Sequence, residues 1–223
     1  MVPKSHHLDL AALIDHTLLR ADARPSEIEV LCEEARRYGF HSVCVNPAWV
    51  SLCTEELKAL KVKVCTVVGF PLGASTTEIK RFEAEHVIRQ GAEEIDMVIN
   101  IGALKAGESG KVQREISEIA SLCRSQGVLL KVIIETALLD DREKELACRL
   151  AVEGGADFVK TSTGFSRGGA TTEDVALMRR VVGADFGVKA SGGIRDTATA
   201  LAMLAAGANR LGTSASVAIV KGI

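Results

Sequence analysis

Two lysines lie inside apolar runs of the kind that form buried strands. Lys160 lies in FVKTSTGF (158–165), and Lys189 lies in VKASGGIR (188–195). Lysine is among the residue types least often buried, because an unpaired ammonium inside a protein is costly. A desolvated lysine beside a second cation is, however, a good nucleophile towards a carbonyl carbon. Two lysines at equivalent points of neighbouring segments therefore indicate a chemical site.

The ε-amine of a lysine attacks a carbonyl only when it carries no extra proton. An ordinary lysine has a pKa of about 10.4, but burial and a neighbouring cation both lower the pKa of a lysine. If the two lysines lie side by side, each disfavours protonation of the other, and one of them is a nucleophile near neutral pH. Asp96, in EEIDMVIN (93–100), can shuttle protons through a water while a carbinolamine loses water. These residues predict a lyase that works through a Schiff base.

Such a lyase needs neither a metal nor another cofactor. A metal-dependent aldolase would use a cluster of histidines, and the five histidines show no ligand spacing apart from the pair His6 and His7. The six cysteines are scattered without a CxxC pair, which favours reduced core residues over a disulfide framework or a zinc site.

Strand-like runs alternate with amphipathic helices along the whole chain. Pro25 is suited to the first turn of a helix, Ser75 with Glu78 fits a capping box, and Asp196 is suited to cap a later helix. The eight predicted strands are 13–18, 41–46, 62–70, 93–100, 129–136, 157–163, 187–193 and 210–214. Eight such units predict the α/β class and one (β/α)8 TIM barrel that forms a single domain over residues 1–223. The alternative is an open doubly wound sheet, although no GxGxxG follows the first strand.

Strand alternation predicts which side chains point into this barrel. Helices cover the outer face of a barrel, so the apolar set of each strand faces outwards and the polar set faces inwards. The inward set from five strands includes Cys44, Asp96, Lys131, Lys160 and Lys189. A buried network of ion pairs without catalysis is the alternative, but such networks stabilise weakly and cost desolvation. The set therefore favours an active site.

Glycine-containing segments close the last three predicted strands. They are TSTG (161–164), SGG (191–193) and GTS (212–214). Barrels often bind phosphate with backbone N–H groups in the loops after strands 7 and 8, and glycine lets the phosphate approach closely. Plain turn chemistry explains any one of these segments, but three at the same end of adjacent strands predict a phosphate site.

At these residues the chain resembles the DeoC family of deoxyribose-phosphate aldolases. The similarity runs from LIDHTLL (13–19) to GTSASVAIV (212–220), and FVKTSTGF and VKASGGIR are its most specific motifs. The resemblance implies a class I aldolase of deoxyribonucleotide catabolism, which reversibly cleaves 2-deoxy-D-ribose 5-phosphate to acetaldehyde and D-glyceraldehyde 3-phosphate. It also implies a homo-oligomer, either a dimer or a tetramer.

The resemblance also assigns roles to residues. Lys160 is implied to be the Schiff-base lysine, Lys189 the cation that keeps it unprotonated, and Asp96 the proton donor and acceptor. Lys131 is implied to support Asp96 electrostatically, while Cys44 is equally well explained as a small core residue. The implied substrate-binding residues are Asp15, Thr17, Cys44, Lys131 and Thr161, and the implied phosphate-binding residues are Gly164, Gly192, Gly193, Gly212 and Ser214.

Two positions depart from the family pattern. Ala215 stands where many members have a second serine after the eighth strand, which removes one hydroxyl from the expected phosphate site. Some members end in a tail with a catalytic tyrosine, whereas the single tyrosine here is Tyr38 and the chain ends at Lys221-Gly222-Ile223. Proton transfer at the enamine carbon is then expected to depend on Asp96 and water, or on a tail absent from this sequence.

Composition limits the partners and the location. The formal net charge is −2, which gives no reason to expect nucleic acid or an anionic membrane as a partner. No apolar run approaches the roughly 20 residues of a membrane span, and the N-terminus lacks the apolar core of a signal peptide. A cytoplasmic protein with a small sugar phosphate as its substrate is expected.

Two other functions fit part of the pattern. Another Schiff-base barrel lyase, such as a transaldolase or a keto-acid aldolase, would place its lysine in a different motif, and a keto acid would favour Arg167 or Arg195 as its carboxylate ligand. A catalytically silent barrel that senses a sugar phosphate would not need both lysines and Asp96.

Overall fold

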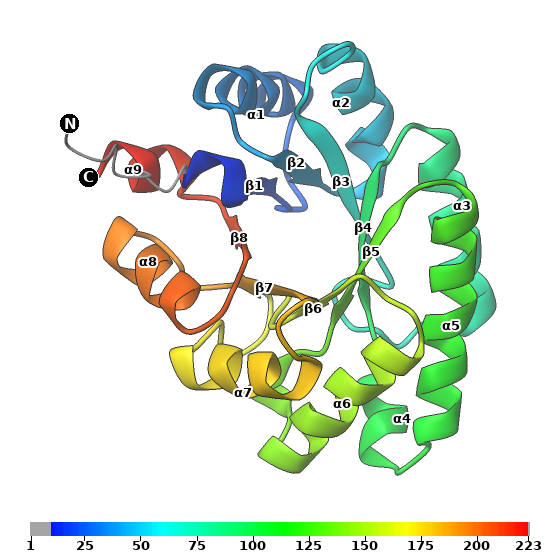
Figure 1. Ribbon diagram of the computed structural model, residues 1–223. Helices are drawn as coiled ribbons and strands as arrows, with labels where there is room; N and C mark the ends of the chain where they lie inside the picture. The colour runs from blue at the N-terminus through cyan, green and yellow to red at the C-terminus, as the bar shows by residue number, and fades with distance from the viewer. Residues whose placement is uncertain (1–9, 223) are drawn as a thin grey trace.

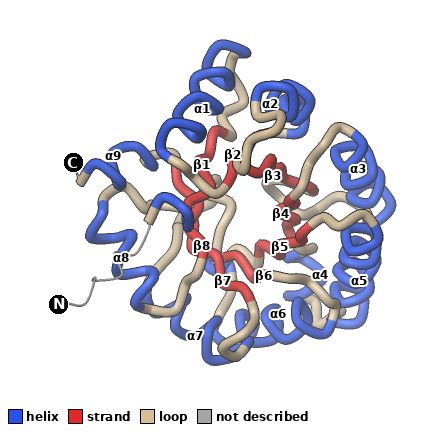
Figure 2. Tube along the Cα trace, turned by 45° about the horizontal axis from the view of Figure 1, so that its top comes forward, coloured by secondary structure: helices blue, strands red, loops and turns tan. Residues whose placement is uncertain are grey.

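The chain folds into a closed barrel of eight parallel strands, each of which is followed by helical structure (Figure 1). The computed structural model describes residues 10–222, so His6 and His7 lie outside the described part. The strands pair in sequence order, and β8 (Arg210–Thr213) closes the barrel against β1 (Ile14–Leu18). Figure 2 shows the ring of strands with the helices arranged around it. The predicted (β/α)8 barrel of the α/β class is confirmed.

Each of the eight predicted runs contains one strand, and every strand is shorter than its run. The other six are β2 (Ser42–Val45), β3 (Lys63–Val68), β4 (Glu94–Val98), β5 (Leu129–Ile133), β6 (Phe158–Lys160) and β7 (Gly187–Ser191). The difference is largest for β6, which ends at Lys160. Directly after it, the Thr161 N–H still donates to the Lys189 carbonyl of β7 at 3.1 Å, and the Thr161 hydroxyl bonds to the backbone of Ser191 at the end of β7.

The helices lie between and after these strands. Their bounds are α1 (Pro25–Tyr38), α2 (Val50–Glu56), α3 (Thr77–Arg89), α4 (Ile101–Lys105), α5 (Ser109–Ser125), α6 (Asp141–Glu153), α7 (Thr172–Val182), α8 (Thr197–Ala205) and α9 (Ser216–Lys221). Three short 3-10 turns cover Ala11–Leu13, Pro47–Trp49 and Thr136–Leu138. No helix within residues 10–222 is both long and apolar enough to cross a membrane.

Two of the three predicted helix starts are confirmed. Pro25 is the first residue of α1, and the Asp196 carboxylate caps α8 by accepting a hydrogen bond from the Thr199 N–H. The prediction for Ser75 was wrong. Thr76 is the N-cap of α3, because its backbone is extended and its hydroxyl accepts a hydrogen bond from the Ile79 N–H.

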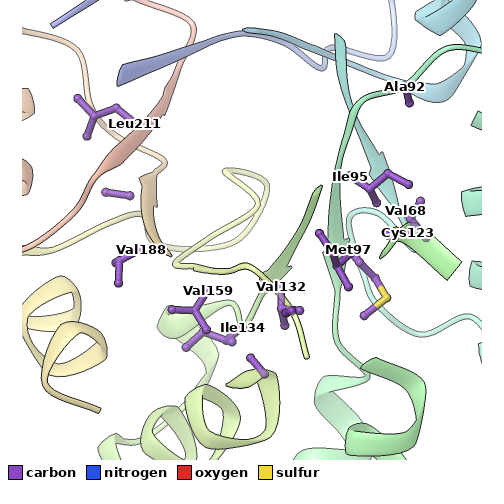
Figure 3. Packing of buried hydrophobic residues seen from close by; sticks show 14 of the residues in the cluster. Val68, Ala92, Ile95, Met97, Cys123, Val132, Ile134, Val159, Val188 and Leu211 are labelled. Atoms are coloured by element: carbon purple, nitrogen blue, oxygen red, sulfur yellow. The ribbon is translucent and has the colours of Figure 1, made fainter. Parts of the chain in front are cut away.

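The apolar core lies between the outer face of the barrel and the helices. Figure 3 shows part of it, including Ile95, Met97 and Val132 on strands β4 and β5. Ile95 and Met97 alternate with Glu94 and Asp96, so β4 sends apolar side chains outwards and acidic ones into the barrel. Burial of each such apolar side chain contributes roughly 1.5–3 kcal/mol. The core therefore holds rigid the strands that carry the interior charges.

Candidate active site

Five charged side chains named in the sequence meet inside the barrel. They are Asp15 on β1, Asp96 on β4, Lys131 on β5, Lys160 on β6 and Lys189 on β7. The strand register places Asp96 opposite Lys131 and Lys160 opposite Lys189. Lys160 is 3% exposed, and the other four are fully buried.

Asp96 joins the three lysines. Its Oδ2 accepts hydrogen bonds from Lys160 Nζ and Lys189 Nζ, each at 2.7 Å, and its Oδ1 accepts one from Lys131 Nζ at 2.8 Å. Burial alone would raise the pKa of Asp96, but the three ammonium groups outweigh burial and hold that pKa well below its usual range. Asp96 is therefore a carboxylate at neutral pH.

Lys189 and Lys160 differ in their remaining contacts. Lys189 Nζ also donates to Asp15 Oδ2 at 2.5 Å. Burial would lower the pKa of Lys189, but Asp15 and Asp96 outweigh burial and raise that pKa above its usual value. Lys189 is thus a permanent ammonium beside Lys160, and it is not the lysine of this pair that becomes neutral.

Lys131 is the second permanent cation. Its Nζ lies 2.6 Å from Glu94 Oε2, 2.8 Å from Asp96 Oδ1 and 3.8 Å from Asp15 Oδ2. Burial opposes the charge, yet the carboxylates of Asp96, Glu94 and Asp15 together raise the pKa of Lys131 well above its usual value. Lys131 is therefore close enough to Asp96 for its positive charge to stabilise the Asp96 carboxylate.

A cavity of about 460 Å³ opens at the carboxyl ends of the strands. Of the three interior lysines, Lys160 alone lines it. Thr17 and the expected phosphate-binding residues also line it, namely Gly164, Gly192, Gly193, Gly212 and Ser214. The cavity therefore joins Lys160 to the glycine-containing loops, as strand order predicts for a TIM barrel.

Backbone conformation explains several of these glycines. Gly164, Gly192 and Gly193 have φ angles of 83°, 87° and 81°, in the region that side chains with a Cβ rarely adopt. A hydrogen bond from the Ala170 N–H to the Gly192 carbonyl, at 3.0 Å, holds the loop after β6 against the loop after β7. These two loops therefore present bare backbone to the cavity.

The remaining predicted residues lie below the cavity and do not line it. Asp15, Cys44, Lys131 and Thr161 are all fully buried. Thr161 connects β6 to the end of β7, because its hydroxyl donates to the Ser191 carbonyl and accepts from the Ser191 N–H, both at 3.1 Å. Cys44 packs with Leu19, Cys65 and Val67 against Phe70. Of the two arginines considered for a keto acid, Arg195 lines the cavity, whereas Arg167 donates to the Ala137 carbonyl.

Sequence reasoning missed two charged members of this cluster. Glu94 and Arg210 are the first residues of β4 and β8, and Arg210 Nη1 lies 3.0 Å from Glu94 Oε2 and 2.9 Å from Asp15 Oδ1. Glu94 has the same strand parity as Asp96, so alternation extended by two residues would have identified it. Arg210 lies two residues before Gly212 on β8, so alternation along that strand would have placed its side chain inside the barrel as well.

Sequence reasoning also missed the contact that holds the loop after Lys160. Glu135 is 2% exposed and has a left-handed backbone, with φ of 56°. One oxygen of its carboxylate accepts hydrogen bonds from both the hydroxyl and the N–H of Thr163. Since Thr163 lines the cavity, Glu135 fixes part of its wall.

Two groups of side chains in residues 10–222 have the spacing of metal ligands. They are Cys44 with Cys65 and Asp96, and Asp15 with Cys65 and Glu94. The carboxylates already bond to ammonium or guanidinium groups, so a metal ion would have to displace cations. Burial also raises the pKa of Cys65 well above its usual value, which disfavours a thiolate ligand. The donor set therefore fits ammonium groups better than a metal.

A closed parallel barrel with a buried lysine at the base of its carboxyl-end cavity defines the class of protein, which is a barrel aldolase. The family model described as DeoC/LacD family aldolase matches residues 10–220. The chain belongs to this DeoC/LacD aldolase family.

Individual relatives agree with that assignment. The chain is 61% identical to deoxyribose-phosphate aldolase 1 of Bacillus licheniformis and 59% identical to the deoxyribose-phosphate aldolase of a Geobacillus species, in each case over 96% of both chains. Among solved structures, the deoxyribose phosphate aldolase of Aeropyrum pernix, described as a unique tetramer, is 37% identical with a TM-score of 0.89. The match covers 95% of this chain and 89% of that one.

Proposed function

We propose that the chain is a class I aldolase that reversibly cleaves 2-deoxy-D-ribose 5-phosphate to acetaldehyde and D-glyceraldehyde 3-phosphate in deoxyribonucleotide catabolism. Relatives named for this activity are about 60% identical to it over nearly their whole length. The observation that carries the residue assignment is the placement of Lys160, which lines the cavity while its Nζ bonds to Asp96 beside two permanent cations.

Lys160 acts as the nucleophile. Its neutral amine forms a bond to C1 of the sugar aldehyde, and the carbinolamine loses water to give a protonated imine. The imine draws the electron pair of the C2–C3 bond towards C2 as that bond breaks. The C3 hydroxyl gives up its proton, D-glyceraldehyde 3-phosphate leaves, and the enamine that remains takes a proton at C2. Water then releases acetaldehyde and restores the amine.

Asp96 moves the protons of these steps. In the free enzyme its carboxylate is bonded to three cationic groups, which makes it a poor proton acceptor. The loss of the Lys160 proton, which must precede attack on the carbonyl, removes one of these charges, so the proton affinity of Asp96 is higher when a hydroxyl must leave as water. In this proposal a water between Asp96 and the substrate carries the proton.

Lys189 and Lys131 act as fixed positive charges. Lys189 disfavours protonation of Lys160, and Lys131 holds Asp96 in its ionised form. Both are enclosed by carboxylates, so neither presents a free amine to the cavity.

The phosphate binds at the rim of the cavity. Gly164, Gly192, Gly193 and Gly212 provide close backbone approach, and Ser214 provides a hydroxyl. Ala215 provides no hydroxyl, so the Ser214 side chain and the backbone N–H groups carry the recognition. Thr17 lies on β1, the strand that pairs with β8, and faces the hydroxyl side of the sugar. Asp15, Cys44 and Thr161 are fully buried and support the walls of the cavity from below.

The wider organisation follows from the same assignment. The barrel forms the single domain of the chain over 1–223, works in the cytoplasm on a small sugar phosphate, and forms a dimer or a tetramer. A relative in the same family is described as tetrameric, which supports a homo-oligomer. Light scattering of the purified chain measures the oligomeric state, and a monomeric mass would contradict the proposed dimer or tetramer.

The activity is tested by incubating the purified protein with 2-deoxy-D-ribose 5-phosphate and measuring both products. Acetaldehyde and D-glyceraldehyde 3-phosphate are expected in equal amounts, with much slower cleavage of 2-deoxy-D-ribose, which lacks the phosphate. Lys160→Leu, which removes the amine and leaves a shorter apolar side chain, is the control and is expected to show no cleavage. Preferential cleavage of a phosphorylated keto acid would contradict the assignment.

A further inference from the structure

Seven charged side chains form one connected network inside the barrel. Three are acidic, namely Asp15, Glu94 and Asp96, and four are basic, namely Lys131, Lys160, Lys189 and Arg210. All are at most 7% exposed. The network extends from the amino ends of the strands, where Arg210 and Glu94 begin β8 and β4, to Lys160 at the carboxyl end of β6.

The amino end of the network is well defined. The Arg210 guanidinium bonds to Asp15 Oδ1 and Glu94 Oε2, and its carbon lies 5.4 Å from the centre of the Phe158 ring. Glu94 Oε2 is also 2.6 Å from Lys131 Nζ. Asp15 in turn contacts Lys189, and Lys131 contacts Asp96, which is the carboxylate that binds Lys160. Arg210 and Glu94 are therefore connected to Lys160 through these contacts.

Six of the seven groups keep their charge at neutral pH. Despite burial, their partners raise the pKa values of Lys131, Lys189 and Arg210, and lower those of Asp15, Asp96 and Glu94, the last to about 2. Three positive and three negative charges then balance. Lys160 is the seventh group, so its proton adds a net charge to a poorly solvated interior.

Three further titratable groups border the network. His41, directly before β2, hydrogen-bonds through Nε2 to Glu94 Oε1 at 2.8 Å, and its side chain is 29% exposed. The Cys65 thiol on β3 donates to Asp96 Oδ1 at 3.4 Å, and Cys44 lies opposite Cys65 on β2. Burial favours the neutral thiol of Cys65, so it does not alter the balance of charges.

We propose that Arg210 and Glu94 are positioning residues which, through this charge balance, determine how readily Lys160 gives up its proton. Arg210 supplies the third fixed positive charge, and Glu94 supplies the third negative charge. The inference rests on the proposed role of Lys160 as the Schiff-base lysine. It assigns a role to two residues at the opposite end of the barrel from the cavity.

Two substitutions test the proposal because they change the charge in opposite directions. Glu94→Gln removes a negative charge and favours neutral Lys160, so the acid limb of the activity profile moves to lower pH. Arg210→Met removes a positive charge and favours the Lys160 ammonium, so the same limb moves to higher pH. One unit charge separated from a buried group by a few side chains shifts the titration of that group by about one pH unit. The acid limb of each variant is therefore expected to move by about that amount.

The measurement is kcat/KM for 2-deoxy-D-ribose 5-phosphate against pH, combined with the pH dependence of borohydride trapping by acetaldehyde. Glu115→Gln is the matched control, because Glu115 is a buried carboxylate bound to Lys80 at 2.7 Å outside this network. It is expected to lower stability without displacing the acid limb. Arg210→Lys, which retains the charge, is expected to keep the limb near its original position.

The proposal is overturned if the acid limbs of Glu94→Gln and Arg210→Met move in the same direction. It is also overturned if neither acid limb moves further than that of Glu115→Gln. Glu94→Gln is nearly isosteric and decides the sign even if Arg210→Met does not fold. If Glu94→Gln itself does not yield folded protein, the acid limb of Arg210→Met is compared with that of Arg210→Lys, and only the former is expected to move to higher pH. Absence of trapping at every pH in the unmodified protein would contradict the proposed function instead.

Discussion

Lys160 and Lys189 are neighbours across β6 and β7, and both donate to the same oxygen of Asp96. Lys189 has a second carboxylate partner in Asp15, whereas Lys160 borders the cavity. One additional carboxylate is therefore the physical difference between a fixed ammonium and a candidate nucleophile. The same reasoning explains why the two lysines cannot exchange roles.

Replacement of Lys189 tests its role as a fixed charge. Lys189→Met is expected to lower kcat at neutral pH by about 10²–10⁴-fold, because the loss of a neighbouring cation lets Lys160 hold its proton. Part of the activity is expected to return as the pH is raised, which a loss of shape alone would not produce. The measurement is kcat against pH.

The matched control for this variant is Lys80→Met. Lys80 is equally buried, but its partners are Glu115 and the Val98 carbonyl, outside the barrel interior. It is expected to be less stable, with an unchanged pH profile. If Lys189→Met and Lys80→Met have the same profile, Lys189 does not act on Lys160.

Strand parity predicted the inward direction of Lys160, Lys189, Asp96 and Lys131 from sequence alone. It did not predict depth along the barrel axis, because depth depends on the stagger between neighbouring strands. The family resemblance implied that Asp15 and Cys44 bind the substrate, and the structure places both of them below the cavity. Gly164, Gly192 and Gly193 needed no such information because they follow strand ends, whereas Gly212 lies within β8.

At the scale of elements, the loops after β6 and β7 form one unit. The Ala170 N–H donates to the carbonyls of both Ser191 and Gly192, and the Ser191 hydroxyl donates to the Ser162 carbonyl at 2.6 Å. These contacts begin directly after β6, where the Thr161 N–H donates to the Lys189 carbonyl and the Thr161 hydroxyl to the Ser191 carbonyl, both on β7. A run of β-type residues could not reveal these side-chain contacts.

Gly169→Ala tests whether this close approach positions the phosphate loops. A Cβ at Gly169 would lie 2.3 Å from the Gly192 carbonyl oxygen, so the two loops must separate. KM for 2-deoxy-D-ribose 5-phosphate is expected to rise by about 10-fold with a smaller change in kcat. The reason is that phosphate contacts stabilise the bound substrate and the transition state equally, so their loss raises KM and leaves kcat nearly unchanged. Steady-state kinetics provide the measurement.

Gly110→Ala serves as the comparison for this variant. In α5, a Cβ at Gly110 has its nearest neighbour at 3.4 Å, the Nη1 of Arg114, so the helix accepts it. Its KM is expected to match that of the unmodified protein. Equal KM values for both variants would show that the approach of the two loops does not contribute to phosphate binding.

At the scale of the whole molecule, the barrel carries its polar groups inside and its apolar core outside. Its acidic members have lowered pKa values, with that of Glu94 at about 2 in place of 4.5. A carboxylate with a lowered folded-state pKa contributes stability that is present above its unfolded pKa and is lost as the pH falls towards the folded value. Acid should therefore destabilise the protein through its interior.

The free energy of unfolding is expected to fall most steeply between about pH 4.5 and 2. Glu94 contributes on the order of 3 kcal/mol to that fall, which corresponds to its displaced pKa. Urea unfolding at a series of pH values measures it. Glu94→Gln, which cannot ionise, is expected to give a shallower decline, and an equally steep one would contradict this account of the network.

The most direct test of the central claim is to trap the covalent intermediate. The purified protein is treated with acetaldehyde and borohydride, and separately with 2-deoxy-D-ribose 5-phosphate and borohydride, and its peptides are then mapped by mass spectrometry. The account predicts a two-carbon adduct on Lys160 with acetaldehyde, no adduct on Lys189 or Lys131, and none in Lys160→Leu. An adduct on Lys189, or the absence of any adduct in an active preparation, would contradict it.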